Sequence, residues 1–394
     1  MGKRSNGEGT LCKRSDGRWM GQVTLDTDGG YKRKTVYGKT QKEVKEKIAE
    51  LKSGCRSGKL IETSSMPLED WMQLWIANYK PDLKVTTRES YELYINVHIK
   101  GSEIGKIPLS KLKTTDLQRF YNAKLKCECK NQKQTLSPTT VRYINLIIKG
   151  ALKQAVNNRM IGENVTDGVV LPKKRKVEII PLTREEVLRF LDAAKSDRLY
   201  TLYLLEVMTG LRRGEILGLK WEDVDFKAGR LKVIHNLYRV NNTDKDAESK
   251  YKLVLLTPKT ESSKRTIPLN QFMVEELLRH KKEQEREKRL YGEDYRDLGM
   301  VFCKLDGDYI SPREFLRQYQ RLLQKAGLER KRFHDLRHTV ASLLINANEN
   351  PKVIQQLLGH STISTTLDIY AHVMDQTLNR SVDNLCNQLE LGKE

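Results

Sequence analysis

A nearly all-helical pattern between Pro67 and about Gly162 is the feature that most constrains the fold of this chain. Apolar side chains recur there at helical spacing, with Lys and Arg on the opposite faces. The pattern predicts four helices, at Leu68–Asn78, Thr86–His98, Thr114–Leu125 and Ser137–Asn157. We therefore expect residues 66–170 to form a compact helical bundle with a basic surface.

The first sixty residues follow a different periodicity. Short β-prone runs occupy Gly9–Lys13, Arg18–Leu25 and Tyr31–Tyr37, and glycine-containing turn signals separate them. Thr40 then precedes a helical run. We expect residues 1–60 to form a small three-stranded sheet plus one helix, whose core is so small that an attached binding module is the best interpretation.

Cations flank aromatic residues in these N-terminal strands. The candidate DNA contacts are Arg18, Trp19, Lys32, Arg33 and Lys34. Such a sheet suits the major groove of DNA. The same residues equally suit cross-strand pairs on a solvated face. The sequence leaves both readings open.

From residue 180 to residue 394 the pattern mixes helix and strand. Thr183 and Glu186 have the spacing of a helix capping box. Strands are predicted at Arg230–His235, Lys252–Leu256 and Lys264–Ile267, and a terminal amphipathic helix at Gln376–Leu389. The expected fold class is therefore a multidomain α+β chain, in which a mixed, mainly helical domain follows the small sheet and the bundle.

Positive charge is concentrated at the front of the chain. Of the net charge of +20, +17 lies in the first 176 residues of 394. Such an excess indicates a polyanionic partner, with nucleic acid ahead of an anionic membrane surface, although a solvated basic surface is the plain alternative. The run Lys173, Lys174, Arg175 and Lys176 is a candidate linker that follows a phosphate backbone, although short basic runs also resemble nuclear-localisation signals.

Several classes of protein are not expected. No apolar run approaches the roughly 20 residues of a membrane span, and the N-terminus lacks the apolar segment of a signal peptide. Six scattered cysteines suit a reducing cytoplasm better than a disulfide framework. The sequence contains no phosphate-binding loop, dinucleotide fingerprint or zinc motif, so we expect neither a cofactor nor a metal.

Five short polar motifs are dispersed over the last 200 residues: Thr209–Glu215, Thr257–Thr260, His334–His338, Leu358–Ser361 and Ile369–His372. At these motifs the chain closely resembles the tyrosine recombinase family, the integrases of phages and conjugative transposons. The resemblance covers about residues 180–390, with a tyrosine ten residues after His360. The two N-terminal parts resemble the arm-binding and core-binding domains of three-domain members. The resemblance implies domains at 1–60, 66–170 and 180–394.

The chemistry of phosphodiester cleavage agrees with this resemblance. Planar guanidinium groups neutralise phosphate oxygens in pairs, which makes Arg212 and Arg337 candidate clamps. His334 lies three residues before Arg337, on the same helix face, and is the candidate general base. His360 is expected to hydrogen-bond a phosphate oxygen. Tyr370 is the candidate nucleophile, a phenol of pKa about 10 that needs a base and nearby positive charge.

The resemblance also implies that Lys259 protonates the leaving 5′ oxygen as general acid. We expect it in a hairpin between the strands at 252–256 and 264–267. Lys264 and Arg265 are close in sequence and leave this assignment open.

The implied reaction is site-specific recombination at the attachment sites of a mobile element, through a 3′-phosphotyrosine and a Holliday junction. The implied partners are double-stranded DNA at core and arm sites, three further copies of this chain in a DNA-bound tetramer joined by the C-terminal tails, an excisionase and a host DNA-bending protein, all in the bacterial cytoplasm. Two alternatives share the scaffold or the chemistry: a DNA-binding regulator and a type IB topoisomerase. The intact set of six residues counts against the regulator, and the basic N-terminal module counts against the topoisomerase.

Overall fold

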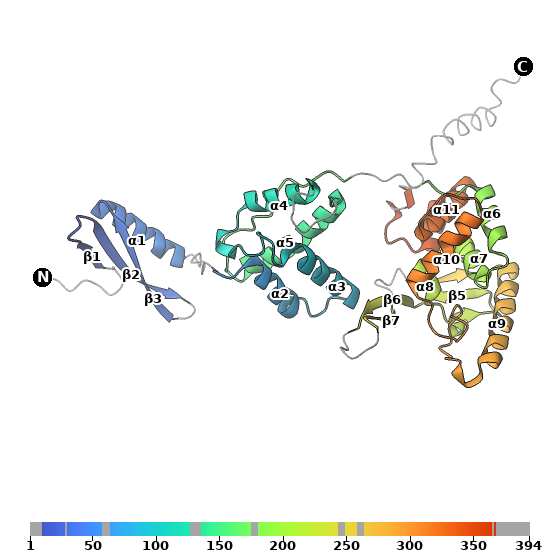
Figure 1. The fold of residues 1–394 in the computed structure, drawn as a ribbon. Coiled ribbons are helices and arrows are strands. Elements are labelled where there is room, and N and C mark those ends of the chain that lie inside the picture. The colour runs from blue at the N-terminus through green and yellow to red at the C-terminus, as the bar shows by residue number, and fades with distance from the viewer. Residues whose placement is uncertain are drawn as a thin grey trace, which may run out of the picture. The chain divides into compact units, whose positions relative to one another are not determined.

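The computed structural model describes residues 10–27, 30–56, 64–126, 135–174, 180–242, 249–257, 264–364 and 366–367. Its internal contacts divide the chain into two compact units, residues 1–176 and 177–394, each with hydrophobic cores of its own. Figure 1 follows the elements in chain order from blue to red. The predicted α+β class is confirmed, and the sheets are small and antiparallel.

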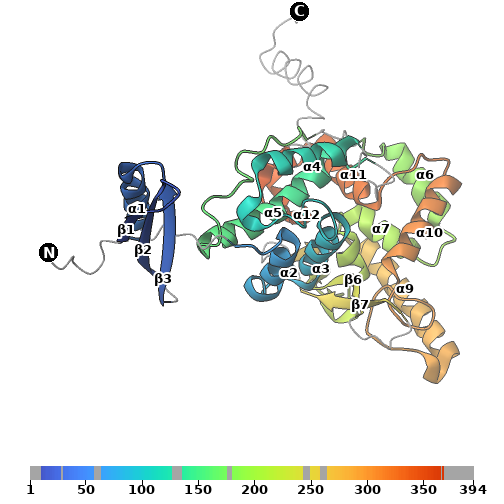
Figure 2. The same cartoon turned by 60° about the vertical axis from the view of Figure 1, so that its left-hand side comes forward.

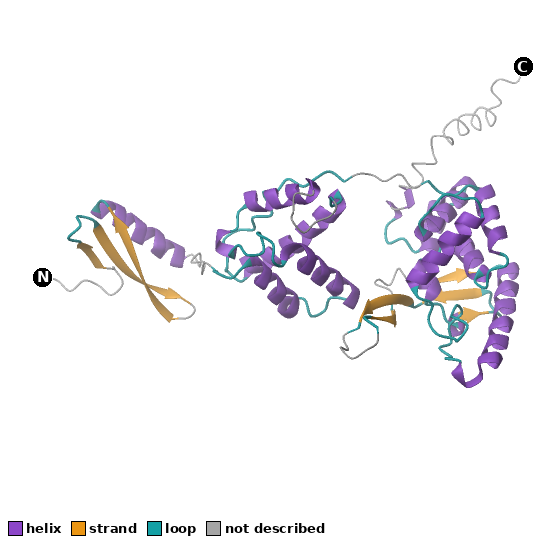
Figure 3. Cartoon of the chain, in the orientation of Figure 1, coloured by secondary structure: helices purple, strands orange, loops and turns teal. Residues whose placement is uncertain are grey.

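A three-stranded antiparallel sheet comes first in the chain (Figure 3), in the order β1 (Thr10–Lys13), β2 (Trp19–Thr27) and β3 (Gly30–Gly38). Helix α1 (Gln41–Arg56) covers one face, where Val44 and Ile48 pack against Val23. Gly21 permits this close approach, because a Cβ there would lie 2.5 Å from Val44 Cγ1. The predicted three strands and one helix are confirmed.

A helical bundle follows, as the apolar periodicity predicts. Its elements are α2 (Leu68–Tyr79), α3 (Val85–Tyr94), η1 (Ile95–Ile99), η2 (Leu109–Lys111), α4 (Thr114–Lys126) and α5 (Pro138–Asn157). Trp71 ties α2 to α5, since its indole N–H donates to the Ala151 carbonyl at 2.9 Å. One detail differs from the prediction of a single helix over 86–98: η1 is a π-helical turn, in which the Lys100 N–H donates to the Ile95 carbonyl at 2.8 Å.

The second unit surrounds a central, almost entirely buried helix. The elements before its strands are α6 (Arg184–Ala194), α7 (Tyr200–Thr209), α8 (Arg213–Leu217) and η3 (Trp221–Asp223). Those after the strands are α9 (Gln271–Tyr291), η5 (Gly292–Asp294), α10 (Pro312–Lys325), α11 (Phe333–Asn346) and α12 (Pro351–Leu358). Helix α7 contacts α6, α9 and α11 (Figure 2), and its Tyr203 belongs to an aromatic cluster with Phe190, Phe315 and Tyr319.

The strands of this unit correct one prediction. They are β4 (Val224–Asp225), β5 (Arg230–Val233), β6 (Asn236–Asn241), β7 (Tyr251–Leu256) and β8 (Arg265–Pro268). The predicted hairpin of 252–256 with 264–267 is wrong, because β7 pairs with β6 whereas β8 pairs with β5. Alternation in the segment 236–241 was the overlooked signal of β6. The segment that carries Lys259 thus connects two different sheets.

No helix among the described residues is long and apolar enough to cross a membrane. The predicted tail helix at 376–389 lies outside the described residues.

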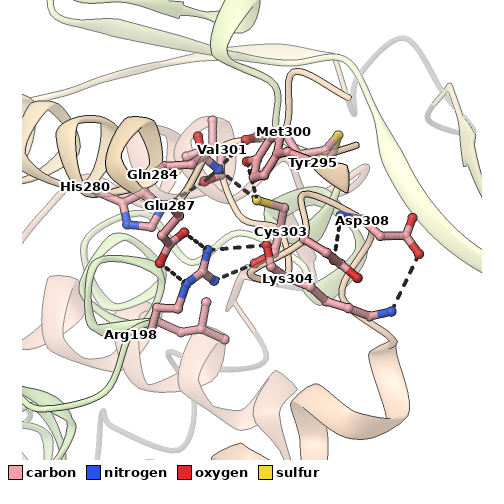
Figure 4. A network of polar contacts seen from close by, with 12 residues as sticks. Arg198, His280, Gln284, Glu287, Tyr295, Met300, Val301, Cys303, Lys304 and Asp308 are labelled. Carbon is pink, nitrogen blue, oxygen red and sulfur yellow. Dashed lines mark hydrogen bonds and ion pairs between the residues drawn. The ribbon is translucent and has the colours of Figure 1, made fainter. Parts of the chain in front are cut away.

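A polar network fastens the loop after α9 to the body of the second unit (Figure 4). Arg198 donates from Nε and Nη2 to the two carboxylate oxygens of Glu287, at 2.6 and 2.5 Å, and from Nη1 to the Cys303 carbonyl at 2.6 Å. Gln284 Nε2 donates to the Met300 carbonyl at 3.1 Å. Two residues of α9 and one residue before α7 therefore hold residues 300–303 in place.

We predict that Arg198→Ala weakens this attachment by roughly 1.5–3 kcal/mol, the usual range for hydrogen bonds to charged groups. Amide hydrogen exchange of peptides covering residues 300–304 should accelerate accordingly. The control is Arg286→Gln, which removes a cation that is 70% exposed and paired with Glu283, and which should change exchange by less than about 0.5 kcal/mol. Equal exchange in the two variants would contradict the assignment.

Candidate active site

Arg212 lies at the turn between α7 and α8. Gly210 ends α7 with a φ of 61°, in the left-handed region that favours glycine. Arg212 is the N-cap residue of α8, where its backbone N–H donates to Glu215 Oε2 at 3.0 Å and its Nη1 donates to Glu215 Oε1 at 2.7 Å. Its Nη2 donates to the Gly359 carbonyl at 2.9 Å. Glu215 therefore both orients Arg212 and caps the start of α8.

Arg337 lies deep in the second unit, on α11, with 2% of its surface exposed. Its Nη1 donates to the Gly210 carbonyl at 2.7 Å, whereas its Nη2 has no hydrogen-bond partner among the described residues. Burial and the charges of Arg212 and Arg265 lower the pKa of Arg337 to about 9, so it stays protonated at neutral pH. A buried cation with an unused donor is a suitable receptor for an anion.

His334 lies one helical turn before His338 on α11, and the two rings meet edge to face with centroids 5.3 Å apart. Local burial and the charges of His338, Arg337 and Arg212 lower the pKa of His334 to about 4. The ring is therefore neutral at pH 7 and can accept a proton.

His360 follows Gly359, which ends α12 with a φ of 65°. The His360 Nδ1 lies 2.9 Å from Thr366 Oγ1, and the His360 N–H donates to the Gln355 carbonyl at 3.1 Å. Burial, followed by the charges of Arg337 and Arg212, lowers its pKa to about 3. The charges of Arg337 and Arg212 thus lower the pKa of both His334 and His360. The turn that carries Arg212, helix α11 and the segment after α12 therefore converge.

Arg212 and His334 border an open groove of about 1390 Å³, whereas Arg337 and His360 are not among its lining residues. Arg212, Arg213 and His334 line one part of it, and the rest of its cationic lining comes from α10 and the loop before α11: Arg313, Arg317, Arg321, Arg330, Lys331 and Arg332. Within the described part of the chain, no Asp or Glu lines the groove. Its charge therefore suits a polyanion.

Four of the remaining predicted site residues lie in segments that the structure does not describe, and two are exposed. Lys259 and Tyr370, and Arg175 and Lys176 of the basic run, lie outside the described residues. Lys173 and Lys174 are exposed at the end of the first unit.

The N-terminal candidates divide between the two faces of the small sheet. Trp19 packs against the core under α1, and Lys34 pairs with Val23, which faces the same way. Arg33 pairs with Thr24 and therefore lies on the opposite, open face. Arg18 is exposed immediately before β2, and the side chain of Lys32 is not described.

Comparison with known proteins identifies the family. Residues 181–377 match the phage integrase family, and residues 68–125 match the SAM-like N-terminal domain of phage integrases. The chain belongs to the phage integrase family. It is a tyrosine recombinase, an enzyme that cuts and rejoins DNA. It is 34% identical over 373 residues to a XerC-like tyrosine recombinase of Caldanaerobacter subterraneus subsp. tengcongensis, covering 92% of this chain and 94% of that protein.

Solved structures of similar fold include two integrases. The Tn1549 transposon integrase in complex with transposon right end DNA matches with a TM-score of 0.66 and 23% identity, over 82% of this chain and 100% of that chain. A lambda integrase tetramer bound to a Holliday junction matches with a TM-score of 0.54 and 18% identity, over 93% of this chain and 96% of that chain. Both show the fold that this recombinase shares.

Two buried groups near the site have contacts that the sequence did not predict: Arg265, which the sequence named only as a neighbour that leaves the assignment of Lys259 open, and Glu206. Arg265 donates from Nη2 to Glu215 Oε2 at 2.9 Å. Glu206 of α7 is fully buried, neither of its carboxylate oxygens has a hydrogen-bond partner among the described residues, and burial raises its pKa well above the ordinary value. A charged residue inside an apolar helix was the available signal for Glu206, whereas one arginine among many gave none for Arg265.

The depressed pKa of His360 predicts a pH dependence of stability. The unfolded chain binds a proton at His360 near pH 6.5, whereas the folded chain does so only near pH 3. Its contribution to stability is therefore complete above pH 6.5 and is lost progressively as the pH falls toward 3. Hydrogen exchange of α11 peptides in the recombinase should show decreasing protection from pH 7 to pH 5, after correction for intrinsic exchange.

In this experiment His360→Gln should reduce that pH dependence without abolishing it, because the pKa values of His334 and His338 on α11 are lowered as well. The surface control Arg286→Gln should leave it as in the wild type. Parallel curves for wild type and His360→Gln would contradict the assigned shift.

Proposed function

We propose that the recombinase cleaves DNA through Tyr370, with the five other residues of the set assisting at a single phosphodiester. The observation that carries this proposal is the convergence of Arg212, Arg337, His334 and His360, from segments far apart in the sequence, beside a groove lined by cations. Groups that neutralise phosphate and groups that carry protons lie together there.

The phenolic oxygen of Tyr370 forms a bond to phosphorus, its proton passes to the neutral imidazole of His334, and the bond from phosphorus to the 5′ oxygen breaks. Lys259 donates a proton to that leaving oxygen. Arg212, Arg337 and His360 stabilise the charge on the non-bridging oxygens. The 3′-phosphotyrosine preserves the energy of the phosphodiester, so a 5′ hydroxyl of another strand can reverse the step without a nucleotide cofactor.

The unused Nη2 donor of Arg337 supports its role as a clamp, because a phosphate oxygen would supply the partner that this buried group lacks within the described residues. The low pKa of His334 leaves the ring neutral before DNA binds, as a general base requires, and the bound phosphate has to raise that pKa for the ring to hold the proton. A bound phosphate would then favour the imidazolium that forms when the ring takes the proton.

We propose that residues 1–60 bind arm sites, residues 66–170 bind the core site together with the groove, and residues 180–394 catalyse the reaction. Arg18, Arg33, Lys32 and Lys34 remain the proposed arm contacts, with Trp19 supporting the sheet from its core face. The run Lys173–Lys176 would follow the phosphate backbone between the two units.

The proposed substrates are the attachment sites of a mobile element, which the recombinase integrates and excises in the bacterial cytoplasm. Similarity to a transposon integrase bound to transposon end DNA supports a mobile element, and similarity to a tetramer on a Holliday junction supports a DNA-bound homotetramer. We propose that the apolar positions Leu378, Val382, Leu385 and Leu389 dock the tail on a neighbouring copy. An excisionase and a host DNA-bending protein are proposed accessory partners.

Trapping the covalent intermediate tests the nucleophile. Radiolabelled duplexes from the flanks of the element that encodes the protein, nicked near the cleavage position, should give a protein-linked band on a denaturing gel with the wild type. Tyr370→Phe should give none, because the attacking oxygen is missing. Tyr291→Phe, at an exposed tyrosine on α9, should behave as the wild type. A band that persists in Tyr370→Phe would exclude this tyrosine.

A substrate with sulfur in place of the bridging 5′ oxygen tests the general acid. A thiolate leaves without protonation, so Lys259→Ala should lose about 10²–10⁴-fold in cleavage rate on the oxygen substrate and recover on the sulfur substrate. Lys264→Ala is the matched comparison. If the sulfur substrate rescues Lys264→Ala instead, the acid is Lys264.

A further inference from the structure

Arg265 is a buried cation with no role in the proposed reaction. It begins β8, six residues after Lys259, and its side chain is only 7% exposed. Arginine is seldom buried to this extent unless it is paired, because removing a charge from water is costly. The hydrogen bonds and the ion pair of Arg265 therefore have to compensate for the burial of its charge.

The guanidinium of Arg265 joins two of the segments that form the proposed active site. Its Nε donates to the Leu357 carbonyl, at the end of α12, at 2.8 Å. Its Nη2 donates to Glu215 Oε2 at 2.9 Å, with the Glu215 side chain 1% exposed. The other carboxylate oxygen of Glu215 accepts from Arg212. One carboxylate is thus shared by two arginines.

The same guanidinium lies directly against Gly359, the residue before His360. A Cβ at Gly359 would lie 3.0 Å from both Cδ and Nη1 of Arg265. Arg212 in turn donates to the Gly359 carbonyl at 2.9 Å. The backbone that carries His360 is therefore held from two sides, by Arg265 at Leu357 and by Arg212 at Gly359.

We propose that Arg265 is a positioning residue of the recombinase, which fixes His360 and Arg212 relative to each other through the Leu357 carbonyl and Glu215. The inference rests on the proposed function, since it takes His360 and Arg212 as the groups that hold the phosphate. Arg265 itself does not touch the substrate in this scheme. Its planar fork is required because the two acceptors lie in fixed directions.

Arg265 is unsuited to the alternative role of general acid. A guanidinium does not release its proton in proteins, and the Nε and Nη2 donors are already committed to Leu357 and Glu215. The sulfur-substituted DNA checks this directly: cleavage by Arg265→Gln should stay slow on it, unlike cleavage by Lys259→Ala.

The first test is structural and needs no DNA. The His360 ring resonance, assigned by its loss in His360→Gln, should shift in Arg265→Gln and keep its wild-type position in Arg286→Gln. Arg265→Lys keeps a positive charge beside Glu215 and should fold even if the glutamine variant does not. Because an ammonium lacks the planar fork, the His360 resonance should shift in this variant as well.

The second test is kinetic, in the full-length protein with saturating nicked duplex. Arg265→Gln should slow covalent adduct formation about 100-fold, the loss typical of small misplacements of catalytic groups, while DNA affinity changes by no more than a few fold. Arg265→Lys should fall between this variant and the wild type. In a His360→Gln background the further loss caused by Arg265→Gln should be small, because both changes remove the same interaction.

An unchanged His360 resonance in both Arg265 variants, or losses that multiply fully in the double variant, would overturn the proposal. If the His360 resonance shifts in the Arg265 variants but the wild type forms no covalent adduct, the proposed function is refuted. Arg265 would then still be the residue that positions His360.

Discussion

The ion pairs of Glu215 are the interaction on which the proposed active site depends. Arg212, Arg265 and Arg337 lie close enough for the charges of the first two to lower the pKa of the third. Burial alone would raise the pKa of Glu215, but the charge and hydrogen bond of Arg265, followed by the charge of Arg212, reverse this and lower it. The carboxylate therefore remains ionised and offsets the repulsion among the arginines. Without it, the polypeptide would have to bury a cation cluster with no counter-charge, which is strongly unfavourable.

The scaffold around this carboxylate is rigid because it is packed and hydrogen-bonded through the backbone. Gly210 allows the end of α7 to approach α12 closely, since a Cβ there would lie 2.5 Å from Leu358 Cδ2. The Gly210 carbonyl accepts a hydrogen bond from Arg337 Nη1, and the Gly210 N–H donates to the Glu206 carbonyl at 2.7 Å. Three helices thus meet at two left-handed glycines, Gly210 and Gly359. The donors are fixed before substrate arrives, which is the condition under which electrostatic stabilisation of a transition state is most effective.

The sequence predicted the structure best where the signal is local, within one helix or one turn. Helical periodicity located the bundle, and the spacing of His334 and Arg337 placed them on one face of α11. It was less informative where partners come from distant segments: nothing in the residues near Arg265 specifies Glu215 or Leu357 as its partners. Strand pairing failed for the same reason, because β7 and β8 are neighbours in sequence but pair with β6 and β5. Pairing of this kind depends on the register of whole sheets, which local composition does not encode.

The net charge of the second unit does not reveal how its charges are distributed over the surface. Residues 177–394 carry a net charge of only +3, yet cations without a single carboxylate line the groove among the described residues. The acids of this unit are placed elsewhere: Glu287 binds Arg198, Glu276 binds Arg279, and Asp308 binds Arg296. Of the groove-lining arginines, Arg212 and Arg332 pair with Glu215 and Asp335. Arg313, Arg317 and Arg321 form no ion pair among the described residues, so the groove keeps an excess of positive charge. A phosphate backbone is therefore attracted to one face of this unit, and the attraction weakens with salt as counterion release requires.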